Sequence, residues 1–268
     1  MEILTNSHKC DTMNKSAGGA ADSFRVTDLK QALKDKNRIN VYIDGEFEFS
    51  LDLSQVVDFG LKIGKILTAK EISDLKSASE FGKLYNSTLA WLLSRPHSEK
   101  ELKTYLKEKQ YKRTLENKKR KNNKERLKTD PELRNRQKDL KLRAKSLPEI
   151  SDENIEKVFN RLKSRGYVDD EKFAKYFVEN RNLKKGTSRK KLELELKSKG
   201  ISSEIIEKVF IENPRDETEE IKKIITKKRK KYTDEKLISY LVRAGFDYQL
   251  SQNLVREMDS QNSAQNLL

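Results

Sequence analysis

Residues 161–200 read RLKSRGYVDDEKFAKYFVENRNLKKGTSRKKLELELKSKG, and the turn residues in this stretch decide how the chain divides into helices. Gly166 followed by Tyr167 is typical of a helix that ends at a left-handed glycine with a packed apolar residue behind it. Ser188 is a favourable N-cap for a further helix, which Gly200 then ends. The stretch therefore predicts helices joined by short glycine turns, with many basic residues between them.

Asp169 and Asp170 follow this first stop, and we interpret them as caps of the next helix that complement its dipole. They could also ligate a metal ion, but no third ligand is near in the sequence. His8 and Cys10 are two more candidate ligands, in residues 1–23, which are polar and predict a disordered tail. We therefore expect no metal ion and no other cofactor.

One pattern occurs three times along the chain. It consists of Ser or Thr, a leucine four residues later, a second leucine after four more, and an apolar residue five residues beyond that. The hydroxyl residue can cap a helix, and leucines four apart lie on one helix face. This internal repeat has the copies Ser98-Leu102-Leu106-Tyr111, Ser188-Leu192-Leu196-Ile201 and Thr233-Leu237-Leu241-Phe246.

Gly200 and Gly245 precede the last apolar residue of the second and third copies, and they predict helix stops. The first copy has Gln110 there, which predicts a weaker stop or a helix that continues. A second amphipathic helix follows each copy, with apolar residues Ile155, Val158 and Phe159, then Ile206, Val209 and Phe210, then Leu250, Leu254 and Val255. A third helix precedes each copy, over residues 84–93, 170–183 and 217–231. The prediction is a mainly α protein with tandem three-helix repeats in a curved array.

The first repeat is longer than the others. The first two leucine patterns lie 90 residues apart, whereas the helices that follow them lie only 51 residues apart, and the difference equals the length of residues 112–150. We therefore interpret 112–150 as an insertion in the first repeat. A helix start is predicted at residues 129–132, and leucines recur every seven residues, which favours a basic helical arm. These leucines are Leu133, Leu140 and Leu147.

The part before the repeats has a different periodicity. Apolar residues alternate with polar ones on both sides of Asp44-Gly45, which predicts a hairpin with one apolar face. Thr68 and Glu71 form a Thr-x-x-Glu pattern that starts a helix. We predict a small β-rich domain over residues 24–81, then a helical domain over 82–268. The alternating residues are Ile39, Val41 and Ile43 before the turn, and Phe47, Phe49 and Leu51 after it.

The 268 residues carry a formal net charge of +15, and the charge is unevenly distributed. It amounts to −2 for residues 1–81, +3 for 82–111, +9 for 112–150 and +5 for 151–268. A basic excess of this kind indicates a polyanionic partner, most often nucleic acid. A solvated Lys/Glu helix surface explains it equally well.

A single cysteine excludes an internal disulfide framework and fits a reducing cytoplasm. The longest clearly apolar run, residues 89–93, is far shorter than the ~20 residues that span a bilayer. We expect a cytoplasmic monomer that does not contact a membrane.

The chain resembles the RecX family, bacterial regulators of the recombinase RecA. The match runs through LKSRGYVDDEKFA at residues 162–174 and continues to Gly200-Ile201. The first repeat fits at RPHSEKEL, residues 95–102, and the third fits more loosely around Gly245-Phe246. The hairpin domain is similar to the N-terminal extension of longer family members, whereas residues 112–150 depart from the family pattern.

This resemblance implies tandem three-helix repeats, no catalysis and a place in homologous recombination, DNA repair and the SOS response. It also implies binding in the groove of the RecA–DNA filament, where such proteins modulate, and usually inhibit, strand exchange and ATP hydrolysis. The expected partners are the RecA filament and single- or double-stranded DNA.

Two basic clusters are the candidate contacts with DNA or with the filament. A helix end needs only one or two cations to complement its dipole, so each cluster exceeds that structural role. The first cluster surrounds Gly186 and consists of Arg181, Lys184, Lys185, Arg189, Lys190 and Lys191. The second consists of Lys227, Lys228, Arg229, Lys230 and Lys231, and Arg243 of the third repeat joins the candidates.

An enzyme is not expected, because the chain has no Gly-rich phosphate loop, no Cys/His zinc set and no nucleophile elbow. His97, the one histidine outside the tail, lies just before a helix N-cap. Two alternatives to a RecA modulator stay open. A helical repressor would bind duplex DNA tightly and selectively without RecA, and a scaffold would bind its partner independently of salt.

Overall fold

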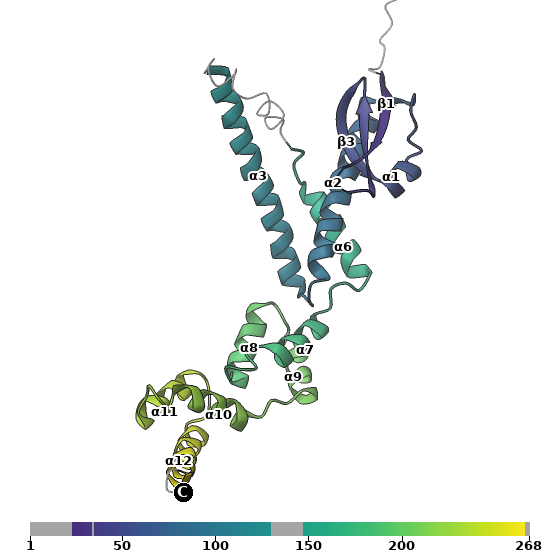
Figure 1. The fold of residues 1–268 in the computed structure, drawn as a ribbon. Helices are drawn as coiled ribbons and strands as arrows, with labels where there is room; N and C mark the ends of the chain where they lie inside the picture. Colours follow the sequence, from purple (N-terminus) through teal and green to yellow (C-terminus); the bar gives the residue numbers. More distant parts are fainter. Residues whose placement is uncertain (1–22, 34, 130–146, 266–268) are drawn as a thin grey trace, which may run out of the picture. The chain divides into compact units, whose positions relative to one another are not determined.

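The computed structural model describes residues 23–33, 35–129 and 147–265 (Figure 1). Nearly all of the tail predicted over 1–23 lies outside the described residues, as do Leu133 and Leu140. The chain divides into two compact units, residues 1–82 and 83–268, and we describe each by itself.

The first unit contains a four-stranded antiparallel sheet with strand order β3-β2-β1-β4. A short helix, α1 (Leu53–Asp58), follows β3. The strands are β1 (Ser23–Gln31), β2 (Arg38–Ile43), β3 (Glu46–Asp52) and β4 (Ile66–Thr68). The small sheet predicted before the helical repeats is therefore present.

The hairpin of β2 and β3 turns at Asp44 and Gly45, whose φ angles of 49° and 86° are those of a two-residue turn with left-handed residues. One part of the prediction is wrong. The register shifts between the pair Val41–Phe49 and the pair Tyr42–Phe47, so the strand gains a residue there. Because one extra residue moves a side chain to the other face, Phe47 leaves the apolar face and is 46% exposed. Its ring instead meets the Tyr42 ring edge-on at 5.9 Å.

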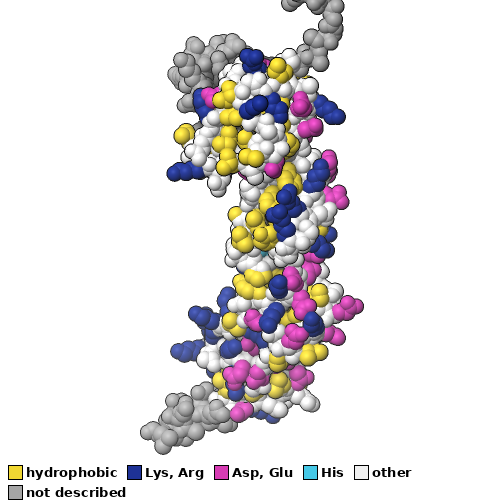
Figure 2. Space-filling model, turned by 90° about the vertical axis from the view of Figure 1, so that its right-hand side faces the viewer, with side chains coloured by type: hydrophobic (Ala, Val, Ile, Leu, Met, Phe, Trp, Pro, Cys, Tyr) yellow, Lys and Arg dark blue, Asp and Glu magenta, His cyan; other side chains and the backbone are white. Residues whose placement is uncertain are grey.

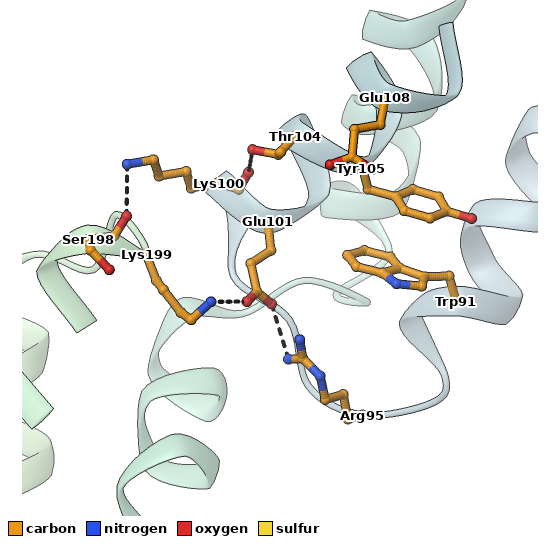
Figure 3. Close-up of a pocket in the computed structure, with 9 residues that line it drawn as sticks. All are labelled: Trp91, Arg95, Lys100, Glu101, Thr104, Tyr105, Glu108, Ser198 and Lys199. Atoms are coloured by element: carbon orange, nitrogen blue, oxygen red, sulfur yellow. Dashed lines mark hydrogen bonds and ion pairs between the residues drawn. The ribbon is translucent and has the colours of Figure 1, made fainter. Parts of the chain in front are cut away.

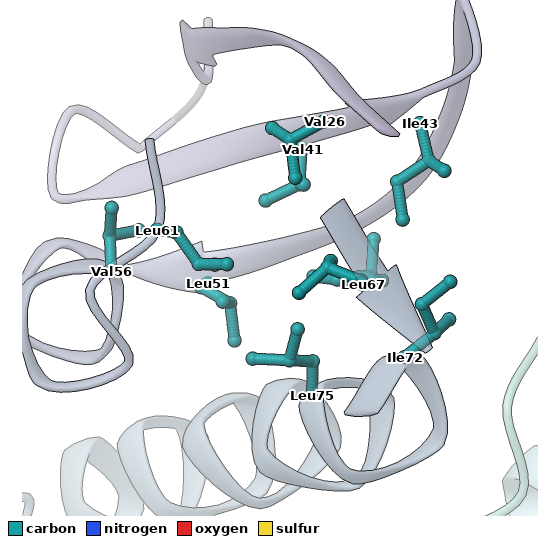
Figure 4. Close-up of a cluster of buried hydrophobic side chains, with 10 residues drawn as sticks. Val26, Val41, Ile43, Leu51, Val56, Leu61, Leu67, Ile72 and Leu75 are labelled. Carbon is teal, nitrogen blue, oxygen red and sulfur yellow. The ribbon is translucent and has the colours of Figure 1, made fainter. Parts of the chain in front are cut away.

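The core of this unit lies between the sheet and the first turns of α2 (Ala69–Leu92) (Figure 4). The backbone N–H of Thr68 donates to Glu71 and that of Glu71 donates to the Thr68 hydroxyl, so the predicted helix start is confirmed. The buried side chains drawn in Figure 4 include Val26, Val41, Leu51 and Leu67 from the strands and Ile72 and Leu75 from α2.

No helix break occurs near residue 82, in contrast to the separate helix predicted from residue 84. Gly82 lies inside α2, which continues for 24 residues. The helix passes Asp52 so closely that a Cβ on Gly82 would lie 2.8 Å from the carboxylate. The glycine is therefore explained by close approach and not by a chain turn.

The second unit is helical and contains three groups of three helices, counting the C-terminal part of α2 in the first. The middle group packs around Phe173, Leu192 and Leu196, and the last around Ile221, Leu237 and Leu241. The predicted repeat is thus present. Its helices are α3 (Glu99–Thr129), α6 (Asp152–Ser164), α7 (Asp170–Asn180), α8 (Arg189–Ser198), α9 (Ser203–Glu212), α10 (Glu217–Lys228), α11 (Asp234–Arg243) and α12 (Tyr248–Gln265).

Two predicted helices end earlier than expected, α7 at Asn180 and α10 at Lys228. α3, in contrast, continues through Gln110 to Thr129, which is the second of the two possibilities left by the missing glycine. The helix start predicted at residues 129–132 falls largely outside the described residues.

The glycine stops are confirmed. Gly200 and Gly245 have φ angles of 85° and 94°, and buried Ile201 and Phe246 donate their N–H groups back into the preceding helices. Gly166 has the same conformation, but Tyr167 is 41% exposed and is not the packed aromatic that the pattern predicted.

The helix caps also connect neighbouring repeats. The Ser98 hydroxyl accepts from the N–H of Glu101 in its own helix and donates to the carbonyl of Lys199, where α8 of the next repeat ends. Asp169 caps α7, as predicted, but Asp170 accepts from the backbone N–H of Glu99 and so caps the helix of the preceding repeat.

The same arrangement recurs one repeat later. The Ser188 hydroxyl accepts from the N–H of Lys191 at 3.3 Å and donates to the carbonyl of Ala244 at 2.6 Å. Glu217, the first residue of α10, accepts from the backbone N–H of Arg189. We call each of these contact sets a repeat joint. Each joint couples the start of one helix to the end of another.

Replacing Ser188 with Ala is expected to lower the free energy of unfolding by about 1–3 kcal/mol, because the change removes a cap and leaves a carbonyl in the joint without its donor. Thr233 is the matched control, since it occupies the same N-cap position of α11 but makes no side-chain cap bond. Thr233→Ala should cost less than about 0.5 kcal/mol. Urea unfolding measures both, and equal losses would contradict the role of the joint.

Candidate functional site

The first basic cluster begins in a turn, because α7 ends before it. Asn182 and Gly186 have φ angles of 52° and 77°, and both Lys185 and Gly186 donate backbone N–H groups to the Asn182 carbonyl. Arg181, Lys184 and Lys185 therefore lie on a tight, hydrogen-bonded turn over residues 181–186.

This turn is held against α10. A Cβ on Gly186 would collide with the backbone carbonyl of Glu220, so only glycine allows the approach. The Glu220 side chain is 3% exposed and accepts from the backbone N–H of Thr187 at 2.8 Å. It is also paired with Arg215 at 2.9 Å and Lys223 at 2.8 Å, so its buried charge is compensated.

The same approach brings the two predicted clusters together. The ammonium group of Lys227, near the end of α10, donates to the backbone carbonyl of Lys184 in the turn. Residues of the first and second clusters thus form one basic surface on neighbouring elements. Figure 2 shows Lys and Arg side chains gathered along one edge of the lower half of the view.

The arginines of the clusters are engaged within the chain. Arg181 pairs with Glu195 at 2.7 Å, and Arg229 pairs with Asp234 at 3.0 Å. The Arg189 guanidinium lies over the Phe210 ring, 4.9 Å from its centroid. Lys228 lies similarly over the Tyr240 ring at 4.3 Å, and Arg243 donates to a carbonyl of its own helix. These contacts give each of them a structural role.

Seven lysines of the clusters are exposed, and within the described part of the chain none of them pairs with a carboxylate. Their ammonium groups lie on the turn, at the start of α8 and at the end of α10. We call them the lysine surface: Lys184, Lys185, Lys190, Lys191, Lys227, Lys230 and Lys231.

A pocket of about 390 Å³ lies at the first repeat joint (Figure 3). The Trp91 ring stacks on Tyr105 with centroids 4.2 Å apart and an interplanar angle of 7°, and its centroid is 3.6 Å from that of the His97 ring. Both neighbours limit access to the indole, which makes it a poor platform for a base. The lining residues are Trp91, Arg95, Lys100, Glu101, Thr104, Tyr105, Glu108, Ser198 and Lys199.

The charges at this pocket are largely compensated. Glu101 accepts from Lys199 at 2.6 Å and from Arg95 at 3.1 Å, and it contacts His97 Nδ1 at 3.0 Å. Burial alone would raise the pKa of Glu101, but the hydrogen bonds and charges of Lys199 and Arg95 lower it below the ordinary value. Lys100 donates to the Ser198 carbonyl. The arrangement fastens the joint.

The joint residues were not recognised as a set in the sequence. Lys100 packs against Gly200, and Lys190 packs against Gly245 in the next joint. The signal that could have found them is Ser-x-Lys, present at residues 98–100 and 188–190. The described residues contain no group of three or more His, Cys, Asp or Glu side chains that could hold a metal ion. No helix among them is long and apolar enough to cross a membrane.

Comparison with known proteins agrees with this architecture. The model of the regulatory protein RecX N-terminal domain matches residues 25–68, and that of the RecX second three-helix domain matches residues 169–209. Regulatory protein RecX of Listeria monocytogenes is 24% identical over 246 residues, which cover 89% of this chain and 77% of that protein. The chain belongs to the RecX family.

Regulatory protein RecX of Bacillus licheniformis is likewise 24% identical, over 88% of this chain and 78% of that protein. A crystal structure of regulatory protein RecX covers 86% of this chain and 98% of its own, with a TM-score of 0.54 at 21% identity, and so has a similar fold. The RecX N-terminal domain corresponds to the strands β1 to β4, and the second three-helix domain corresponds to α7, α8 and α9.

The stability of this RecX-family chain should depend on pH through His97. Burial, together with the charge of Arg95, lowers the pKa of His97 below its ordinary value of 6.5. The unfolded chain therefore binds more protons between the two values, so the free energy of unfolding falls as the pH drops through 6.5.

His97→Gln is expected to flatten the pH dependence between about pH 5 and 7, where the carboxylate of Glu101 stays ionised. Urea unfolding at several pH values measures the slope for both proteins, and His8 is common to both. Parallel profiles would contradict the assignment, whatever the absolute stability of the variant.

Proposed function

We propose that this protein is a non-catalytic regulator that binds the RecA–DNA filament and inhibits its strand exchange and ATP hydrolysis. The family supports a regulatory role, because the curated relatives carry the name regulatory protein RecX. RecA acts on DNA in the cytoplasm, and we place the protein there, as a monomer.

The lysine surface is the observation that carries the proposal. Seven exposed ammonium groups without carboxylate partners are close enough to face one polyanion. Lysine is a strongly hydrated point charge on a flexible stem, which suits phosphate contacts that do not depend on sequence. This chemistry fits a regulator that follows a filament along any DNA sequence better than it fits a sequence-selective repressor.

The arginines contribute differently from the original expectation. Arg181 and Arg229 are held in ion pairs inside the helical unit, so their replacement would disturb packing as well as charge. We therefore assign the partner contact to the lysines and a supporting role to Arg181, Arg189 and Arg229. A variant that tests binding should leave the arginines unchanged.

The RecA DNA-dependent ATPase tests this function. Wild-type protein should inhibit it when added in amounts comparable to RecA. Changing Lys184, Lys185, Lys190 and Lys191 together to Gln should weaken the inhibition at least tenfold, because up to four phosphate contacts are lost. The matched control changes four exposed lysines outside the lysine surface to Gln: Lys36, Lys62, Lys70 and Lys175.

The control should inhibit like the wild type, and circular dichroism should show unchanged helix content in both variants. No effect of the wild-type protein on the ATPase would contradict the proposal. Equal inhibition by the two variants would retain the regulator but reject the lysine surface as its contact. Tight, sequence-selective duplex binding without RecA would favour the repressor instead.

A further inference from the structure

The outer half of α3 is the most basic helical segment that the structure describes outside the lysine surface. Residues 112–126 contain eight Lys or Arg and two Asp or Glu. They continue the helix that begins inside the first repeat, and they extend it by about 22 Å. In Figure 1, α3 is one long helix whose end leads into the grey trace. Nothing in the regulatory assignment explains this extension.

The inner half of α3 is firmly held. Leu102 and Leu106 are fully buried in the first repeat. The segment before α6 then packs along the helix: Gln110 donates to the carbonyl of Ile150, and Asn117 both donates to and accepts from the backbone of Leu147 at 2.8 Å. The helix therefore leaves the repeat in a defined direction.

Beyond Asn117 the character of the helix changes. The side chains of Lys118, Lys119, Lys121 and Lys124 are exposed, and within the described residues none of them pairs with a carboxylate. Lysines three residues apart on a helix repel one another, at a cost of a few tenths of a kcal/mol per pair. A helix that is polar on all sides and mostly of one charge is best stabilised by a partner of opposite charge.

The directions of these lysines indicate the shape of that partner. Each residue advances by about 100° around an α-helix, so the four lysines point to at least three different sides. A flat acidic protein surface would meet only one side of such a helix. The major groove of duplex DNA is about 12 Å wide, admits one helix and has phosphates on both walls.

The remaining surface of the segment agrees with a groove. Asn122 and Asn123 are exposed, and their side-chain amides can bond base edges or phosphates. Leu115 is the one large apolar residue between 112 and 126, whereas a helix that lies in a membrane interface needs a continuous apolar face. An anionic membrane is therefore the weaker candidate.

We propose that the outer half of α3 is a second nucleic-acid contact, which docks in the groove of duplex DNA. It is separate from the lysine surface and does not need RecA. This goes beyond the proposed function, because it gives the protein a duplex-binding element of its own. Such an element would let the protein hold double-stranded DNA next to a filament.

The test is binding of a short labelled duplex to full-length protein without RecA, followed by fluorescence anisotropy between 50 and 200 mM salt. The arm variant changes Lys118, Lys119, Lys121 and Lys124 together to Gln, a good helix former that keeps side-chain length. The slope of log affinity against log salt should become shallower by about 3, at close to 0.9 per lost phosphate contact. Affinity at 100 mM salt should fall at least tenfold.

The control variant at Lys36, Lys62, Lys70 and Lys175 should keep the wild-type slope. Equal slopes for the arm variant and the control would overturn the proposal. So would an equal loss of affinity for a single strand of the same sequence, since a single strand has no major groove. Loss of binding to vesicles containing anionic lipid, with duplex binding unchanged, would assign the arm to a membrane and also overturn it.

This test is independent of the regulatory proposal. If the wild-type protein leaves the RecA ATPase unchanged but the arm variant shows the shallower slope, the proposed function fails and the duplex contact stands. If the wild-type protein inhibits RecA and the arm variant binds duplex like the control, the opposite holds.

Discussion

A serine hydroxyl shared between two helices is the interaction on which the helical unit depends. Ser188 caps α8 and at the same time donates to the last turn of α11 in the next repeat, and Ser98 does the same one repeat earlier. A helix start has unpaired N–H groups and a helix end has unpaired carbonyls, so one hydroxyl satisfies both. The glycine stops at Gly200 and Gly245 make this possible, because they let the serine-bearing helices approach closely.

The joints also explain where the basic residues lie. Contact between repeats pins the turn after α7 onto α10 through Gly186 and the buried carboxylate of Glu220, and Lys227 then reaches Lys184. Two charge runs that are about 40 residues apart in the sequence become one surface. Arginines there are used for ion pairs and ring contacts inside the unit, because their planar guanidinium groups suit such contacts. The lysines remain in solvent, where they are available to a polyanion.

Much of this fold follows from local patterns in the sequence. The three leucine patterns, the glycine stops and the Asp44-Gly45 hairpin each depend on residues a few positions apart. The features that were missed depend on distant residues. Gly82 suggested a break but serves the approach of α2 to Asp52, and the extra residue that turns Phe47 outward appears only in the pairing with β2. Likewise, the pairing of Arg181 with Glu195 across two helices removes it from the candidate site, which the charge run alone did not show.

The central claim is that the lysine surface is the part of the protein that meets the RecA–DNA filament. Hydrogen–deuterium exchange of the full-length protein, with and without the filament, tests it without any substitution. The account predicts slower exchange in residues 181–186 and 227–231 when the filament is present, whatever happens along α3. Unchanged exchange in both segments, with protection confined to the sheet of the first unit, would contradict it.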